Sequence, residues 1–145
     1  SVYNEFGEPV YNVQGELFSW GAKIHLYDLN GTELYYIKQK VLTFLPEYEI
    51  YKGESFCARV KKEFTFFNPR LNVQSSFGDF EIQGSFWEMD FDIQCNGQSF
   101  GEIHKEWLTW GDTYCLSIVD AGNAAFFTSL VIAIDNCLHN GSKKQ

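Results

Sequence analysis

The sequence predicts a mostly β protein, in which a closed antiparallel barrel of about 12 strands, built from hairpin repeats, wraps around one C-terminal hydrophobic helix. Three observations predict this fold class. A short pattern that begins as Val13-Gln14-Gly15-Glu16 recurs along the chain, and an aromatic-rich stretch follows each copy. Residues 124–134 form the only long, uniformly apolar run. A helix that is apolar all round has to be buried in protein or lie in lipid.

The hairpin repeat has a period of about 22 residues, which is room for two strands and two turns. Its copies are Val13–Glu16, Ile37–Lys40, Val60–Glu63, Ile82–Ser85 and Ile103–Glu106. The dipeptides Asn30-Gly31 and Asn96-Gly97 predict type I′ turns, because both central residues of that turn need a positive φ. The repeats and residues 113–119 give about 11 or 12 strands, and a sheet that large usually curls or closes.

The predicted helix begins near Asn123, whose side chain can cap it, and stops near Asn140-Gly141. Residues 124–138 would span about 22 Å as a helix. A membrane-spanning helix needs roughly 20 apolar residues, and Asp135 interrupts this run. We therefore expect the helix to fill the barrel, because a lumen of about 12 strands needs a filler.

Composition and charge suggest one domain, residues 1–145, with the barrel at about 2–119 and the helix at about 123–139. The aromatic content of 18% favours strands and an aromatic core. The net charge of −8 disfavours nucleic-acid binding and broad attraction to anionic membranes, although it allows a local basic patch. Four cysteines without metal-ligand spacing are expected to be buried thiols in a cytoplasmic protein.

Several motifs in a fixed order carry a resemblance to a known family. They are Ile37–Lys40, Leu45–Tyr51, Val60–Thr65, Gly84-x-Phe86-Trp87, Trp107-x-x-Trp110–Tyr114 and Val131–Asp135. Together, from about Val2 to His139, they resemble the LURP-one-related family.

That resemblance implies the fold of the tubby C-terminal domain and of phospholipid scramblases, a closed barrel of about 12 strands around a central hydrophobic helix. It also implies a small, stand-alone domain of bacterial type, whose role is mostly unassigned. Aligning Tyr3–Gly7 with Tyr27–Gly31 places the counterpart of Leu17–Lys23 before Ser1, so we expect the family's N-terminal strand unit to be missing.

Catalytic and metal chemistry find little support in the sequence. Ser, His and acidic residues are present without a nucleophile motif such as GxSxG, so the sequence predicts no enzyme and no cofactor. Glu88, Asp90 and Asp92 alternate on one strand face, where oxygen ligands could bind Ca²⁺. We expect a solvated acidic face there rather than a metal site, because no glycine-bearing calcium loop accompanies them.

A basic cluster is the candidate site for lipid or phosphate, and its residues are Lys38, Lys40, Arg59, Lys61 and Lys62. Lys38 and Lys40 share a strand face, and Lys61 takes the repeat position of Lys38. Clustered cations can bind a phosphate or a phosphoinositide head group. The alternative is that these cations protect strand edges and keep the protein soluble.

The predicted function is that of a non-catalytic binding module, cytoplasmic or peripheral at the membrane. It would contact phosphoinositide-like lipid head groups or a protein partner through its outer surface, without nucleic acid. Two alternatives stay open: a scramblase-like membrane protein with an inserted C-terminal helix, and a barrel that carries a small apolar ligand. The sequence makes no prediction of oligomeric state.

Overall fold

The computed structural model describes residues 1–64, 70–85, 90–108, 111–119 and 121–139. Within these ranges, eleven strands form one antiparallel sheet in which every strand pairs with its neighbours in sequence. The strands are β1 (Val2–Tyr3), β2 (Pro9–Gly15), β3 (Lys23–Tyr27), β4 (Glu33–Gln39), β5 (Glu47–Lys52), β6 (Ser55–Glu63), β7 (Arg70–Ser75), β8 (Gly78–Ser85), β9 (Asp90–Cys95), β10 (Gln98–Leu108) and β11 (Gly111–Ile118).

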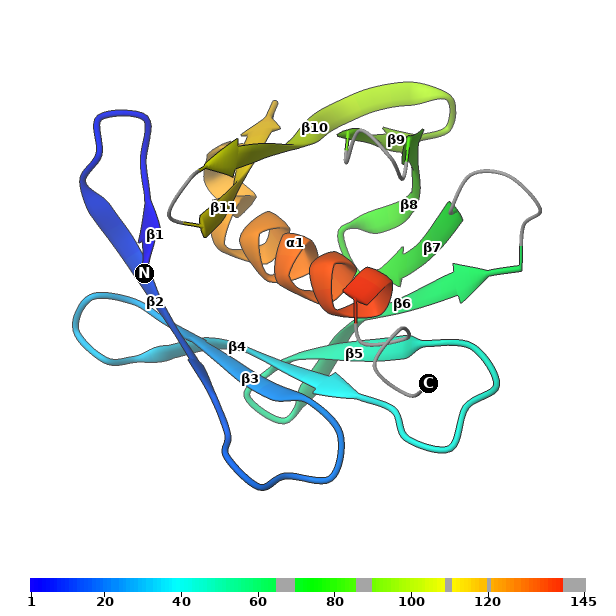
Figure 1. Cartoon of the computed structure of the whole chain (residues 1–145), viewed down its shortest axis with the longest axis horizontal. Helices are drawn as coiled ribbons and strands as arrows, with labels where there is room; N and C mark the ends of the chain where they lie inside the picture. The colour runs from blue at the N-terminus through cyan, green and yellow to red at the C-terminus, as the bar shows by residue number, and fades with distance from the viewer. Residues whose placement is uncertain (65–69, 86–89, 109–110, 120, 140–145) are drawn as a thin grey trace.

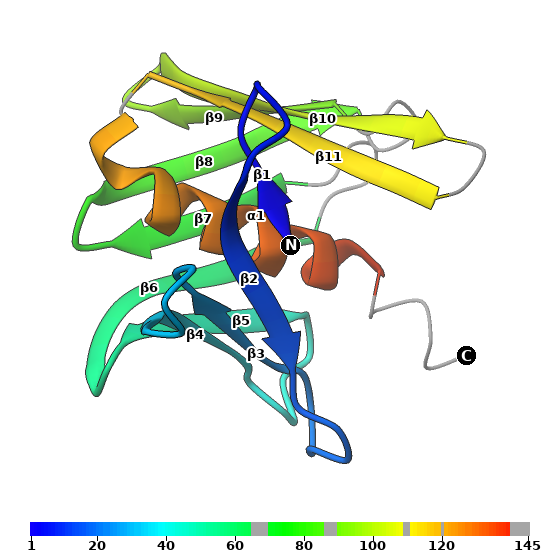
Figure 2. The same cartoon turned by 90° about the vertical axis from the view of Figure 1, so that its left-hand side faces the viewer.

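The sheet curls around a single long helix. A short 3-10 helix, η1 (Ala121–Asn123), leads into α1 (Ala124–His139), which contacts β4, β5, β6 and β11. Both views show α1 running through the middle of the curled sheet (Figures 1 and 2). The predicted placement of the helix inside the β-structure is therefore confirmed.

Closure of the barrel is not confirmed. The strand order runs from β1 to β11, and the described residues form no ladder between these two outer strands. The side of α1 that carries Thr128, Val131 and Ile132 is only partly buried, whereas Phe126, Leu130 and Ala133 are fully buried. The helix is thus enclosed less completely than its uniformly apolar sequence predicts.

Strand alternation builds the core. In β4 to β6 the inward residues are buried, and cross-strand pairing brings Ile37 opposite Ile50 and Ile50 opposite Ala58. Val73 and Phe80 continue the same layer on β7 and β8. A slip of one residue would turn these side chains to the solvent, so burial fixes the register.

The two Asn-Gly turns differ. Asn96 and Gly97 both have positive φ, at 53° and 80°, as the predicted type I′ turn requires. At Asn30-Gly31 only Gly31 has a positive φ, so the type I′ prediction is wrong there. The Asp28 carboxylate accepts hydrogen bonds from the backbone N–H groups of Asn30 and Thr32, each at 2.9 Å, and so stabilises a longer turn.

The aromatic-rich stretches account for less of the core than their composition predicts. Leu17–Trp20 and Val41–Phe44 fall in the β2–β3 and β4–β5 loops, and several of their large side chains are exposed. We call the end of the sheet that carries these two loops the loop end, and the opposite end, with the glycine turns, the turn end.

The cysteine prediction holds for two of four residues. Cys57 and Cys137 are buried, but Cys95 is only partly buried and Cys115 is exposed. Burial raises the pKa of the Cys137 thiol to about 12, so this group stays protonated in the core.

Candidate functional site

The outer face of β4, β5 and β6 carries charged residues at alternate positions. Glu49 pairs across the sheet with Lys38 on one side and with Arg59 on the other. One row further toward the loop end, Glu47 pairs with Lys61. Because side chains alternate between the faces of a sheet, these residues lie opposite the core face that holds Tyr48.

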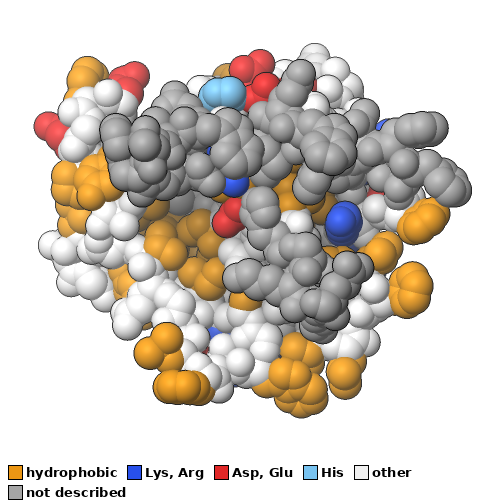
Figure 3. All heavy atoms as spheres, in the orientation of Figure 1, with side chains coloured by type: hydrophobic (Ala, Val, Ile, Leu, Met, Phe, Trp, Pro, Cys, Tyr) orange, Lys and Arg blue, Asp and Glu red, His pale blue; other side chains and the backbone are white. Residues whose placement is uncertain are grey.

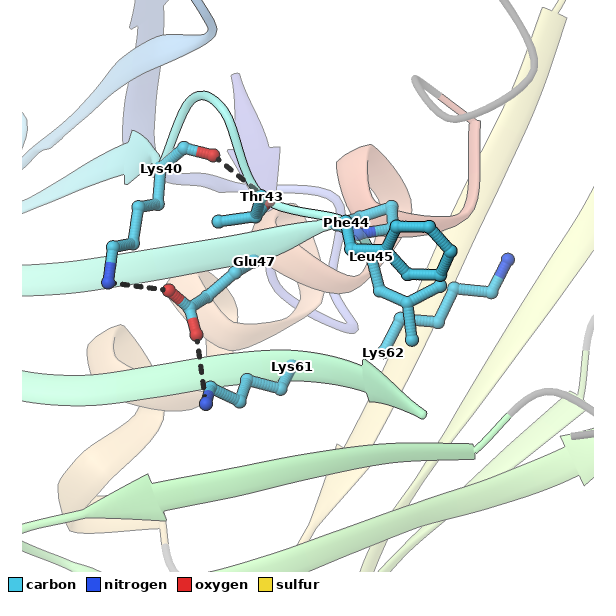
Figure 4. Close-up of a pocket in the computed structure, with 8 residues that line it drawn as sticks. Lys40, Thr43, Phe44, Leu45, Glu47, Lys61 and Lys62 are labelled. Carbon is cyan, nitrogen blue, oxygen red and sulfur yellow. Dashed lines mark hydrogen bonds and ion pairs between the residues drawn. The ribbon is translucent and has the colours of Figure 1, made fainter. Parts of the chain in front are cut away.

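Glu47 is the centre of this charged face. Its side chain is almost fully buried, and its two carboxylate oxygens lie 3.3 Å from Lys40 Nζ and 3.3 Å from Lys61 Nζ (Figure 4). A buried carboxylate needs such partners, since an isolated one would lose its hydration without compensation. Glu47 therefore holds two ammonium groups side by side.

One oxygen of Glu47 keeps hydrogen-bonding capacity. Within the described residues Oε2 has no hydrogen-bond partner, although Lys40 Nζ lies near it as an ion-pair partner. The contact with Lys40 is thus electrostatic rather than an aligned hydrogen bond. This oxygen is itself buried, so the protein encloses it rather than exposing it to a ligand.

An open pocket of about 410 Å³ lies against this ion-pair cluster. We call it the lysine pocket, and it is lined by Lys40, Thr43, Phe44, Leu45, Pro46, Glu47, Lys61 and Lys62. Lys62 extends beyond Phe44 and Leu45, with its amino group directed away from Glu47 (Figure 4). The β4–β5 loop supplies an apolar wall and Lys40, whereas β5 supplies Glu47 and β6 supplies Lys61 and Lys62.

Of the five predicted cations, the structure brings three together. Lys40, Lys61 and Lys62 line the lysine pocket, whereas Lys38 and Arg59 lie one row away and flank Glu49. Arg59 packs its guanidinium over the Phe56 ring at 5.5 Å. Arg59 thus has a local contact that the pocket lysines do not share.

Comparison with known proteins now places the chain. The family model described as LURP-one-related matches residues 1–135. The chain belongs to the LURP-one-related family. It is also 30% identical over 139 residues to the uncharacterised protein YxjI of Bacillus subtilis, a match that covers 96% of this chain and 85% of that protein. No solved structure matches the chain.

None of these matches indicates a catalytic family. In the described part of this LURP-one-related chain, no helix is long and apolar enough to cross a membrane. The family assignment made from the motifs is confirmed.

A second ionic cluster, which the sequence did not suggest, lies on the outer face of β3. His25 Nδ1 is 2.7 Å from Glu33 Oε1, and His25 Nε2 is 2.9 Å from Glu16 Oε2. Its ring stacks on Tyr36 with centroids 4.8 Å apart. Burial lowers the pKa of His25, but the hydrogen bonds to Glu33 and Glu16 raise it more, so the pKa lies above its usual value.

The acidic strand face has partners of its own. Asp90 bonds to His104, and Asp92 accepts hydrogen bonds from Gln94 at 2.8 Å and Ser99 at 2.5 Å. Glu88 lies outside the described residues. Over the described ranges, His, Cys, Asp and Glu form no group of three that could hold a metal ion.

Sequence reasoning missed two features of the site. Glu47 was not singled out, although it alternates with core residue Tyr48 and faces Lys61, a pairing that becomes visible only once the strand register is known. The exposed loops were also missed, because runs such as Leu17–Trp20 have the composition of buried strands.

Proposed function

We propose that this LURP-one-related domain is a non-catalytic module that binds anionic lipid head groups in the lysine pocket. The single observation that carries the proposal is an open pocket lined by Lys40, Lys61 and Lys62, in which buried Glu47 pairs with the first two. An ammonium group has three donors, and Glu47 uses only part of that capacity on Lys40 and Lys61. The remaining donors suit phosphate oxygens.

Local charge supports this reading despite the overall charge of −8. The pocket holds three lysines and one glutamate, a local charge of +2. At physiological salt, charges further away than about 8 Å are largely screened. A bound phosphate therefore responds mainly to the pocket and only weakly to the distant acidic residues.

Charge favours one class of head group. A polyol phosphate, such as glycerol phosphate or inositol phosphate, is an anion that the pocket lysines can bind. Choline head groups also carry a quaternary ammonium group, which the same lysines repel, so we expect them to bind more weakly.

Residues typical of nucleophilic catalysis are poorly placed in the lysine pocket, which supports the non-catalytic part of the proposal. Thr43 is the hydroxyl residue among those that line the pocket, and it donates to the Lys40 carbonyl oxygen at 3.4 Å. Neither a histidine nor a cysteine is among the described lining residues, so Thr43 has no neutral base of the usual kind beside it.

A titration with soluble head group tests the proposal without a membrane. Inositol trisphosphate is added to the wild-type protein and to Lys62→Gln, and Kd is measured by calorimetry. Loss of one charge-assisted contact should weaken binding about tenfold, since this corresponds to about 1.4 kcal/mol. Lys62 is the better choice than Lys61, because Lys61 also supports buried Glu47.

Lys52→Gln is the matched control, since Lys52 is an exposed lysine at the turn end of β5. It should leave Kd unchanged. Equal affinities for wild type and Lys62→Gln, or a wild-type protein that binds no inositol trisphosphate, would remove the lysine pocket as the head-group site. The outer surface would then be assigned to a protein partner.

The alternatives from the sequence have no specific observation behind them. A scramblase-like protein needs α1 in lipid, yet Phe126, Leu130 and Ile134 of α1 are packed in the core. A carrier needs space between the helix and the sheet, and the same side chains occupy that position.

We also propose that the domain has the closed, tubby-like barrel that its family resemblance implies. The curled meander of eleven strands around α1 supports this proposal. An experimental structure in which the sheet is closed between β1 and β11 would establish it, and one with two solvent-exposed outer edges would refute it.

A further inference from the structure

Two loops at the loop end of the sheet share an unusual backbone conformation. Phe18 in the β2–β3 loop has φ 61°, and Leu42 in the β4–β5 loop has φ 63°. The two residues occupy equivalent positions in the repeat, 24 residues apart, and each precedes a hydroxyl residue, Ser19 or Thr43. Bulky residues rarely adopt this left-handed conformation, because their Cβ atom crowds the backbone.

The side chains of these two residues do not contribute to core packing. Phe18 is fully exposed and Leu42 is 87% exposed, so neither packs against the core. Glycine or asparagine would adopt the same backbone conformation more easily. Strain that burial does not offset points to a role outside folding.

Other large apolar side chains join them at the same end of the sheet. Leu17 and Trp20 are exposed in the β2–β3 loop, Phe44 is 98% exposed in the β4–β5 loop, and Phe64 is exposed directly after β6. We call Leu17, Phe18, Trp20, Leu42, Phe44 and Phe64 the apolar rim. Figure 3 shows hydrophobic side chains along the lower edge of the molecule, where Figure 1 places the β2–β3 and β4–β5 loops.

The two ends of the sheet differ in charge, because the turn end is mainly acidic whereas the loop end carries lysines together with the acidic residues Glu16 and Glu63. The apolar rim adjoins the lysine pocket, whose wall includes Phe44 itself, and Lys23 opens β3 directly after the β2–β3 loop. Lys23 also lies opposite Lys38 in the strand pairing, a like-charge pair that an anion would relieve. Acidic residues occupy or adjoin the turns at the turn end, and they are Glu5, Glu8, Asp28, Glu54 and Asp79.

We propose that the apolar rim inserts into the surface of a lipid bilayer whose head groups are anionic. Aromatic and leucine side chains partition into the interface between head groups and acyl chains, and neighbouring lysines contact the phosphates above them. An apolar rim beside the lysine pocket fits this surface, whereas an uncharged apolar partner would leave the pocket's net charge of +2 unbalanced. The acidic turn end faces away from the membrane. The head-group contact in this arrangement rests on the function proposed for the lysine pocket.

Vesicle co-sedimentation tests the insertion. The wild-type protein is mixed with vesicles of phosphatidylcholine containing phosphatidylglycerol, and compared with the double variant Phe18→Asn, Trp20→Ser, whose two residues are exposed and do not line the lysine pocket. The matched control is Phe6→Ser, Leu29→Ser, since Phe6 is 78% exposed in the β1–β2 turn and Leu29 is exposed in the β3–β4 turn, both at the turn end. We expect the rim variant to bind vesicles at least tenfold more weakly and the control to bind like the wild type.

The inositol trisphosphate titration separates this inference from the proposed function. Insertion is supported if the rim variant binds inositol trisphosphate with an unchanged Kd but no longer sediments with vesicles. Insertion is refuted if the rim variant sediments with vesicles as the wild type does. It is also refuted if the wild type does not sediment with vesicles. In both cases, if Lys62→Gln still weakens the binding of inositol trisphosphate, the lysine pocket remains the proposed head-group site. Equal losses of vesicle binding in the rim and control variants would also refute it.

Discussion

At the scale of single residues, buried or bridged charges determine what this surface can do. Glu47 is an acidic residue in a position where alternation would allow exposure, but the β4–β5 loop and two lysines cover it. It orders Lys40 and Lys61 without neutralising both. His25 is a comparable bridge on β3, where two glutamates share one imidazole. In both clusters the charges have fixed positions, which surface lysines and histidines usually lack.

The His25 cluster should make stability depend on pH. Its folded-state pKa is raised, so its contribution to the free energy of unfolding is complete below the unfolded-state pKa of about 6.5. That contribution is lost as the pH rises through the higher folded-state pKa. We therefore expect Tm to fall more in the wild type than in His25→Gln when the pH is raised from about 6 to about 8.

Thermal melts followed by circular dichroism at several pH values provide the comparison. Glu16, Glu33, Tyr27 and Tyr36 surround His25, and none of these carboxylates or phenols changes in the variant. Parallel curves of Tm against pH for the two proteins would mean that the bridge contributes nothing.

At the scale of secondary-structure elements, strands and loops follow different rules. The strands follow the period-two pattern, so Ile37, Ile50 and Val60 could be assigned to one core face from sequence alone. The β2–β3 and β4–β5 loops break the rule that large apolar residues are buried. Leu17–Trp20 has the composition of a core strand, and no local signal marks Phe18 as a residue with positive φ. The apolar rim therefore could not be predicted from composition.

The strained conformation at Leu42 predicts a stabilising substitution. Asparagine tolerates the left-handed region better than leucine does, and Leu42 is exposed, so little packing is lost. We expect Leu42→Asn to raise the free energy of unfolding by about 1 kcal/mol. Urea denaturation at equilibrium measures the change.

Leu29→Asn is the matched control, because Leu29 is also exposed in a connecting segment but has no positive φ. It should change the free energy of unfolding little. Equal effects of the two substitutions would show that the backbone at Leu42 is not strained, and would weaken the argument that function maintains it.

At the scale of the whole molecule, the curled meander of repeated hairpins gives the domain two different ends. Each repeat contributes one loop to the loop end and one turn to the turn end, so similar loops gather at one end. The sequence repeat and the apolar segment of α1 were enough to predict β-structure around a central helix. Closure could not be decided from them, because pairing between β1 and β11 depends on three-dimensional curvature rather than on local pattern.

The proposed binding to a membrane surface depends on a difference between the two ends of the sheet. The apolar rim and the lysine pocket share the loop end, and the acidic turns lie at the opposite end. Helix α1 then acts as the core that holds the loops in place, rather than as the part that enters lipid.

Hydrogen exchange followed by mass spectrometry, with and without anionic vesicles, directly tests whether the domain binds membranes through its loop end. Binding through the loop end should slow exchange in residues 16–22 and 40–46, where the rim loops lie, and leave residues 28–32 in the β3–β4 turn unchanged. Protection of residues 28–32 without protection of the rim loops, or no protection on vesicles at all, would contradict the claim.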